Sequence, residues 1–195
     1  ATPETLGIIA GNRDLPVLLA REARAAGVRR LVAVAMKGET DETLAEHVDE
    51  ITWVKVGQLN KLIKTFRGAD VTQCVMVGQI APDNLFNLRP DLRAMKLLVG
   101  LKKKNAHTIF GGIAAELAKD GIELIEATPW LQSAMPAKGF ILGPQLTESQ
   151  QADIEYGLRM ATEIARLDIG QTVVVKNGAV LAVEGWGGTD ACLPR

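Results

Sequence analysis

The chain has 195 residues, of which 47% are hydrophobic and 23% are charged, and its formal net charge is −1. This hydrophobic content is sufficient for a substantial core, and the nearly balanced charge argues against a general nucleic-acid binder. The two cysteines, Cys74 and Cys192, do not suggest the disulfide framework of a small secreted protein, and no apolar run reaches membrane-spanning length. These features favour a cytoplasmic protein.

The first half of the chain alternates short apolar runs with helical patterns. We predict strands over 6–10, 31–36, 51–56, 73–77 and 122–125, and helices over 15–26, 41–47, 58–67, 91–101 and 106–119. Continuous apolar strands separated by helices are typical of a parallel sheet covered on both faces. The sequence therefore predicts an α/β fold, with a Rossmann-like open, mainly parallel sheet in a first domain over 1–126.

Each of the first four predicted strands is followed within two residues by a glycine. Sheets of this kind bind ligands beyond the carboxyl ends of their strands, so we expect substrate contacts from Gly11, Asn12, Gly78 and Gln79. Two interpretations of the first of these segments, Gly11–Pro16, stay open. Its backbone N–H groups bind phosphate at the start of a helix, or the segment is a tight turn with Asn12 in the left-handed conformation.

A proline- and glycine-bearing stretch over 127–146 is interpreted as a linker. A helix is then predicted over 147–167, with Thr147 and Gln150 at capping-box spacing, followed by a β-hairpin around Asn177-Gly178. One helix and one hairpin enclose little core. Either a partner covers this surface or the polypeptide continues. We expect the second, with 147–195 as the start of a second α/β domain that continues beyond this chain.

The hairpin leads into a glycine-rich segment closed by Thr189 and Asp190. The Asp190 carboxylate suits two roles. It can cap the N-terminus of a helix, or it can bind Mg²⁺, which typically takes one or two carboxylates together with phosphate oxygens and water.

The densest basic stretch is Lys102-Lys103-Lys104, with further cations upstream. A solvated helix face is the simplest interpretation, and binding to a diphosphate or to an anionic membrane surface are the alternatives. His47 and His107 have no second His or Cys at ligand spacing, which argues against a zinc site.

Several segments, kept in order across essentially the whole chain, resemble the LpxI-type UDP-2,3-diacylglucosamine pyrophosphatases of lipid A biosynthesis. The matching segments are Leu6–Gly11 with Leu15-Pro16, Val34–Glu39, Trp53-Val54 with Gly57–Leu59 and Lys61–Lys64, Leu88–Arg93, Asp168–Val175, and Glu184 with Gly188–Ala191. The resemblance implies a Rossmann-like amino-terminal domain and a separate carboxyl-terminal domain that hold the substrate between them. It also implies Mg²⁺-dependent hydrolysis of UDP-2,3-diacylglucosamine to UMP and 2,3-diacylglucosamine 1-phosphate (lipid X).

On this basis, we expect Asp190 to bind the metal and, with Thr189, to carry the catalysis. Gly188, Gln171 and Lys176 are the expected substrate contacts of the second domain. The expected partner is a nucleotide-sugar lipid, with no nucleic acid. Peripheral contact with the cytoplasmic face of the inner membrane and a homo-oligomer are further expectations.

The chain departs from the family pattern at three places. Gly187 stands where the family usually has Glu, Asn105-Ala106-His107 replaces a frequent Gly-Asp-Asp, and Gly11-Asn12-Arg13 replaces a glycine-rich first loop. Lost carboxylates weaken metal binding. The alternative function is therefore a non-catalytic nucleotide-sugar or lipid-binding protein of the same fold.

Overall fold

The computed structural model describes residues 2–80, 90–101, 106–139, 142–185 and 187–193. The chain divides into two compact units, Ala1–Pro136 and Ala137–Arg195. Each unit is described by itself below.

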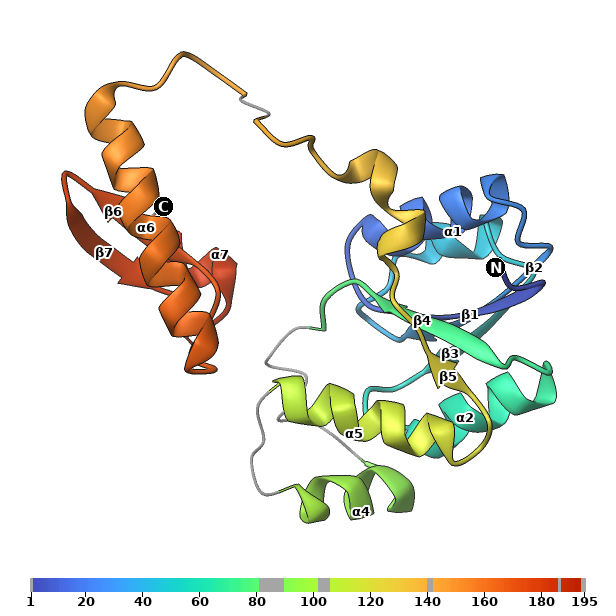
Figure 1. Cartoon of the computed structure of the whole chain (residues 1–195). Helices are drawn as coiled ribbons and strands as arrows, with labels where there is room; N and C mark the ends of the chain where they lie inside the picture. Colours follow the sequence, from blue (N-terminus) through green and yellow to red (C-terminus); the bar gives the residue numbers. More distant parts are fainter. Residues whose placement is uncertain (1, 81–89, 102–105, 140–141, 186, 194–195) are drawn as a thin grey trace. The chain divides into compact units, whose positions relative to one another are not determined.

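The first unit is built on a single five-stranded sheet (Figure 1). Its strands are β1 (Thr5–Ala10), β2 (Arg30–Met36), β3 (Glu50–Val54), β4 (Gln73–Val77) and the two-residue β5 (Glu123–Leu124), in the spatial order β3-β2-β1-β4-β5. All neighbouring strands pair in parallel. The predicted α/β fold with a Rossmann-like sheet is thus confirmed, and the order of the strands reverses between β1 and β4, where such sheets bind ligands.

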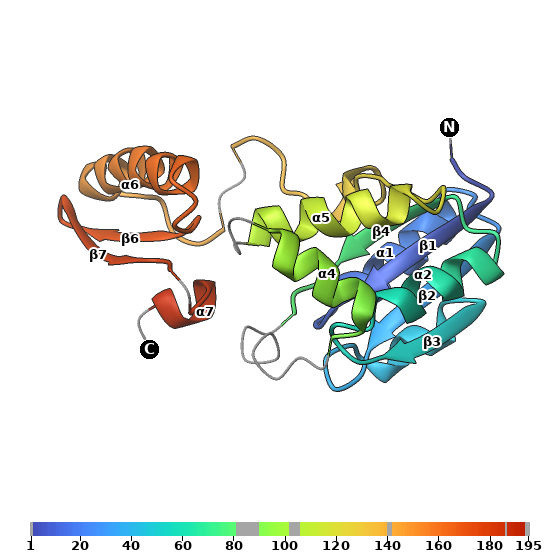
Figure 2. The ribbon, with the colours of Figure 1, turned by 90° about the horizontal axis from the view of Figure 1, so that it is seen from below.

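Helices α2 (Leu59–Gly68), α4 (Leu92–Gly100) and α5 (Ala106–Ala118) cover one face of the sheet. Figure 2 views the unit from this side, with these helices in front of the strands. The core on this face contains the fully buried side chains of Phe66, Ile63 and Leu117. The apolar residues of α2, which recur every three or four positions, therefore form its buried side: Leu59, Leu62, Ile63 and Phe66.

Helix α1 (Leu15–Ala25) covers the other face, together with the 3₁₀ turns η1 (Glu42–Glu46) and η2 (Thr128–Trp130). Pro16 lies in the first turn of α1, where a missing N–H costs no hydrogen bond. Trp130 is 8% exposed and packs in this core. The beginning of the stretch interpreted as a linker therefore packs against the first unit, and a third short turn, η3 (Gln132–Ala134), follows it.

The second unit contains helix α6 (Glu148–Arg166), the antiparallel hairpin β6 (Val173–Lys176) and β7 (Ala179–Val183), and the short helix α7 (Thr189–Cys192). Thr147 and Gln150 form the predicted capping box at the start of α6. The turn residues Asn177 and Gly178 adopt φ angles of 52° and 74°, as the predicted hairpin requires.

The hairpin turn is fixed to α6 by one side chain. Asp153 accepts hydrogen bonds from the backbone N–H groups of Asn177 (2.7 Å) and Gly178 (2.6 Å). Apolar side chains remain exposed in this unit, among them Leu158 at 69% and Leu181 at 59%. Among the residues that the structure describes, no helix combines the length and the apolar character needed to cross a membrane.

Candidate functional site

The carboxyl ends of β1 and β4 are joined by backbone hydrogen bonds. The N–H of Gly11 donates to the carbonyl of Val77 (2.8 Å), and the N–H of Asn12 donates to the carbonyl of Gln79 (2.7 Å). These two amides are therefore used within the fold. They are not free to bind phosphate, because each already has an acceptor; phosphate binding by the N–H groups that follow, at the start of α1, stays a prediction.

This close approach of the two strand ends explains the glycines. A Cβ atom on Gly11 would lie 2.5 Å from the carbonyl oxygen of Gln79, and one on Gly78 would lie 2.7 Å from that of Asn12. Gly78 also adopts a φ of 87°, which favours glycine. The alternative interpretation of the first segment as a tight turn needs correction in one detail, since Arg13, with a φ of 66°, is the left-handed residue instead of Asn12.

The side chain of Asn12 supplies an unusual polar group at this edge. Its Nδ2 donates to Oε2 of Glu39 (3.1 Å), whereas its Oδ1 is buried and has no hydrogen-bond partner among the described residues. A buried carbonyl oxygen without a partner costs free energy, which a donor from a bound ligand or water would recover. An amide oxygen accepts hydrogen bonds. The position therefore suits an N–H or O–H group of a nucleobase or sugar better than an ionised phosphate.

Thr40 fixes the end of β2 that carries Glu39. Its hydroxyl donates to the carbonyl of Ala10 (2.7 Å) and accepts from the N–H of Met36 (2.9 Å). Thr40 is 7% exposed, so this link between β1 and β2 is protected from water. Sequence analysis assigned no role to Thr40 or Glu39; the signals available were their place soon after a predicted strand and, for Glu39, its place in the family-like segment Val34–Glu39.

An open hollow of about 340 Å³ lies beside Gly78. It is lined by Met76, Val77, Gly78, Phe110, Leu124, Ile125, Glu126 and Ala127. Most of these side chains are apolar, so this edge of the sheet can accommodate a weakly polar group. A larger hollow of about 560 Å³ is lined by Ala20, Arg21, Arg24, Ala25, Glu46, His47, Val48 and Asp49. None of the predicted site residues lines this second hollow.

In the second unit, Glu184 organises the segment that precedes α7. This side chain is 8% exposed. Its Oε2 accepts from the backbone N–H of Gln171 (3.2 Å), and its Oε1 accepts from the hydroxyl of Thr189 (3.2 Å). The hydroxyls of Thr172 and Thr189 lie 3.4 Å apart.

Gly170 allows this arrangement, because a Cβ there would lie 2.3 Å from the carbonyl oxygen of Glu184. The structure thus brings Gln171 and Thr189 together around Glu184. Lys176 lies at the opposite end of the hairpin, where it pairs with Ala179 beside the turn, so it does not belong to this cluster.

Asp190 is an exposed residue in the first turn of α7. The N-cap of this helix is Gly188, with a φ of 77°, so the interpretation of Asp190 as the N-cap is wrong. An acidic residue in the first turn still interacts favourably with the positive end of the helix. Gly188 supplies the backbone conformation that starts α7.

The described residues offer Mg²⁺ few protein ligands in one place. They contain no group of three or more His, Cys, Asp or Glu side chains arranged to bind a metal. Mg²⁺ sites in phosphate chemistry typically use one or two carboxylates and complete the octahedron with phosphate oxygens and water. The exposed carboxylate of Asp190 fits such a shared site, whereas an all-protein cage does not fit these residues.

The remaining candidates from the sequence have simpler explanations or fall outside the description. Cys74 is buried in the core of the first unit, and this burial raises the pKa of its thiol to about 12, which makes it a poor nucleophile. The stretch 102–104 and the side chain of His107 lie outside the described residues.

Comparison with known proteins extends over both units. The LpxI N-terminal domain matches residues 5–134, and the LpxI C-terminal domain matches residues 137–195. The UDP-2,3-diacylglucosamine pyrophosphatase LpxI of Caulobacter vibrioides is 33% identical over 193 residues, which cover 97% of this chain and 68% of that protein. The chain therefore belongs to the LpxI family.

Proposed function

We propose that this protein hydrolyses the diphosphate bond of UDP-2,3-diacylglucosamine, releasing UMP and 2,3-diacylglucosamine 1-phosphate, a step of lipid A biosynthesis. The observation that carries this proposal is the match of both LpxI domains, supported by a relative aligned to nearly the whole chain whose name states this activity. A hydrolase acting on a small nucleotide-lipid substrate is the coarser conclusion that family membership supports.

The first unit would recognise the nucleotide end of the substrate. The unpartnered Oδ1 of Asn12 would accept a hydrogen bond from an N–H or O–H group, and Glu39 holds the other end of the same amide. Gly11 and Gly78 allow the strand ends to meet, and Gln79 offers an exposed amide beside them. The hollow beside Gly78 would accept a less polar part of the substrate.

The second unit would act at the diphosphate. Asp190 would hold Mg²⁺, which when bound would neutralise phosphate charge and polarise the phosphorus–oxygen bonds. The hydroxyl proton of Thr189 is directed to Glu184. We therefore assign Thr189 the role of fixing the start of α7, and hence the position of Asp190. Gln171 and the backbone of Gly188 would supply further polar contacts to the substrate, and a contact from Lys176 would be made separately, at the other end of the hairpin.

Replacing the proposed metal ligand tests the catalytic role. Asp190→Asn keeps the shape of the side chain and removes its charge, so UMP release should fall by about 100-fold and require more Mg²⁺, since a bound metal contributes several kcal/mol. The control is Glu148→Gln, which changes an exposed carboxylate at the start of α6 and should retain wild-type turnover. Unchanged turnover and Mg²⁺ dependence in Asp190→Asn would show that this residue is not the ligand.

The second candidate function is a binding protein that retains the fold without the chemistry. One observation favours it: Gly187 stands where the family usually has a carboxylate. Calorimetric titration of the wild-type protein with UDP-2,3-diacylglucosamine, run beside the assay for UMP, separates the two functions. Binding without UMP release supports the second candidate, and the absence of both contradicts each of them.

A further inference from the structure

Helix α4 presents large apolar side chains to solvent. Leu92 is 78% exposed, Met95 is 47% exposed and Val99 is 81% exposed. Their spacing places them on one side of the helix, and Lys96, also exposed, lies on the same side. We call these four residues the outer face of α4.

The opposite side of α4 is fixed to the first unit. Ala94 is buried, and Leu97 packs so closely on α5 that a Cβ atom on Gly112 would lie 2.5 Å from a methyl carbon of Leu97. The outer face therefore cannot turn inward without breaking this packing.

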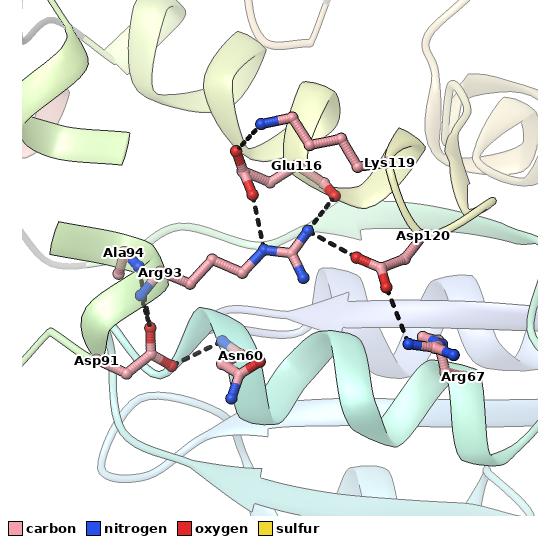
Figure 3. Close-up of polar contacts among 8 residues, drawn as sticks. All are labelled: Asn60, Arg67, Asp91, Arg93, Ala94, Glu116, Lys119 and Asp120. Carbon is pink, nitrogen blue, oxygen red and sulfur yellow. Dashed lines mark hydrogen bonds and ion pairs between the residues drawn. The ribbon is translucent and has the colours of Figure 1, made fainter. Parts of the chain in front are cut away.

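Polar contacts also attach α4 to its two neighbouring helices, α2 and α5 (Figure 3). Asp91 caps α4 by accepting from the N–H groups of Arg93 (3.1 Å) and Ala94 (2.9 Å), and it also accepts from the N–H of Asn60 in α2 (2.6 Å). Arg93 pairs with Glu116 of α5 (2.6 Å) and with Asp120 just beyond it (2.6 Å). The orientation of the outer face is thus determined by two neighbouring helices.

Basic residues outnumber acidic ones in the segment that contains α4, although Arg93 is already paired with Glu116 and Asp120. Over 89–104 the sequence contains one acidic residue, Asp91, and six basic residues: Arg89, Arg93, Lys96, Lys102, Lys103 and Lys104. Asp91 is occupied as the helix cap, and the outer face itself carries Lys96 without an acidic residue. A two-fold contact between copies would bring like charges together on this face. An anionic lipid surface complements both the apolar side chains and the cation.

We propose that the outer face of α4 docks on the surface of an anionic lipid bilayer. Leu92, Met95 and Val99 enter the boundary between headgroups and acyl chains, while Lys96 contacts lipid phosphate. Helices of this kind lie in the plane of the interface, with the apolar side inserted by about 5–10 Å. The proposal goes beyond the hydrolysis of the substrate and does not depend on it, because docking requires no substrate.

Vesicle flotation of the purified protein tests the docking, with vesicles of phosphatidylcholine alone or of phosphatidylcholine with one third phosphatidylglycerol. The variants are Leu92→Ser/Val99→Ser, which changes two exposed apolar residues, and Lys96→Glu. The control is Leu142→Ser/Leu158→Ser, which changes leucines that are 89% and 69% exposed outside α4. Wild type and control should bind the anionic vesicles, and the α4 double variant should bind at least about tenfold more weakly.

Lys96→Glu should weaken binding to anionic vesicles by about tenfold and leave binding to neutral vesicles unchanged. Wild-type protein that fails to bind anionic vesicles overturns the proposal, as does equal binding by the α4 double variant. The proposal would also be overturned if the α4 double variant changed its oligomeric state in light scattering but kept wild-type vesicle binding. That result would assign the outer face to a contact between copies. Hydrolysis of detergent-dispersed substrate is measured separately, and every α4 variant should retain it if the protein is the proposed hydrolase.

Discussion

Glu184 shows how a single buried carboxylate can organise a site. A buried charge is costly unless hydrogen bonds compensate for its lost hydration. Here each carboxylate oxygen has a donor, one from the backbone of Gln171 and one from the hydroxyl of Thr189. The side chain thus links the start of β6 to the start of α7, and it positions the residue next to Asp190.

Glu184→Gln should lower the free energy of unfolding by about 1–3 kcal/mol. The NH₂ of the new amide would face either the N–H of Gln171 or the hydroxyl of Thr189, so one of these donors would lose its acceptor. Urea unfolding followed by circular dichroism measures this change. Glu155→Gln serves as the control, since it makes the same substitution at an exposed position inside α6 and should unfold with the wild-type midpoint. Equal midpoints for wild type and Glu184→Gln would show that the two hydrogen bonds contribute nothing to stability.

At the scale of elements, the second unit depends on contacts between α6 and its hairpin. Asp153 accepts both N–H groups of the turn, and bonds of this kind to a charged acceptor are among the stronger ones. Asp153→Ala should therefore lower the free energy of unfolding by about 1.5–3 kcal/mol. Glu155→Ala, two residues away on an exposed part of α6, should change it by less than about 0.5 kcal/mol. Similar losses in both variants would mean that the two hydrogen bonds to the turn do not explain the effect.

Most elements of the first unit could be predicted because their patterns are local. The apolar runs of β1, β2 and β4 and the helical spacing in α2 are visible in the sequence, and the hairpin is predicted by Asn177-Gly178 alone. The packing of Trp130 could not be predicted in this way. Its burial depends on the face of a sheet formed by strands distant in sequence, and nearby prolines indicate a loop whether or not that loop packs.

The candidate site was predictable only where position on a strand determines it. Gly11 and Gly78 were located by their place after β1 and β4, but their contact with one another depends on strand order. The roles of Glu39 and Glu184 depend on partners 27 and 13 residues away, respectively, and no spacing rule connects such residues. Lys176 and Gln171 are both predicted as substrate contacts of the second domain, but Gln171 lies beside Glu184, whereas Lys176 lies beside the hairpin turn.

For the molecule as a whole, several carboxyl groups make stability depend on pH. Hydrogen bonds from Lys119 and then Arg93 lower the pKa of Glu116 below its ordinary value. The backbone N–H of Leu31, with Arg24, similarly lowers the pKa of Asp49. The Arg93 contacts connect α4 with α5, so protonation of Glu116 weakens an interaction between elements as well as a local one (Figure 3).

A carboxyl with a lower pKa in the folded than in the unfolded protein stabilises the fold fully above its unfolded pKa, about 4 for these groups. That stabilisation is lost as the pH falls through the folded-state pKa. The urea midpoint should therefore decrease between pH 7 and pH 3.

Glu116→Gln should be less stable than wild type at pH 7 by about 1–3 kcal/mol, since it weakens the pairing of Arg93, and it should lose less stability on acidification. The exposed control Glu46→Gln should keep the wild-type pH dependence. If Glu116→Gln loses as much stability as wild type between pH 7 and pH 3, the network around Arg93 does not contribute to acid unfolding.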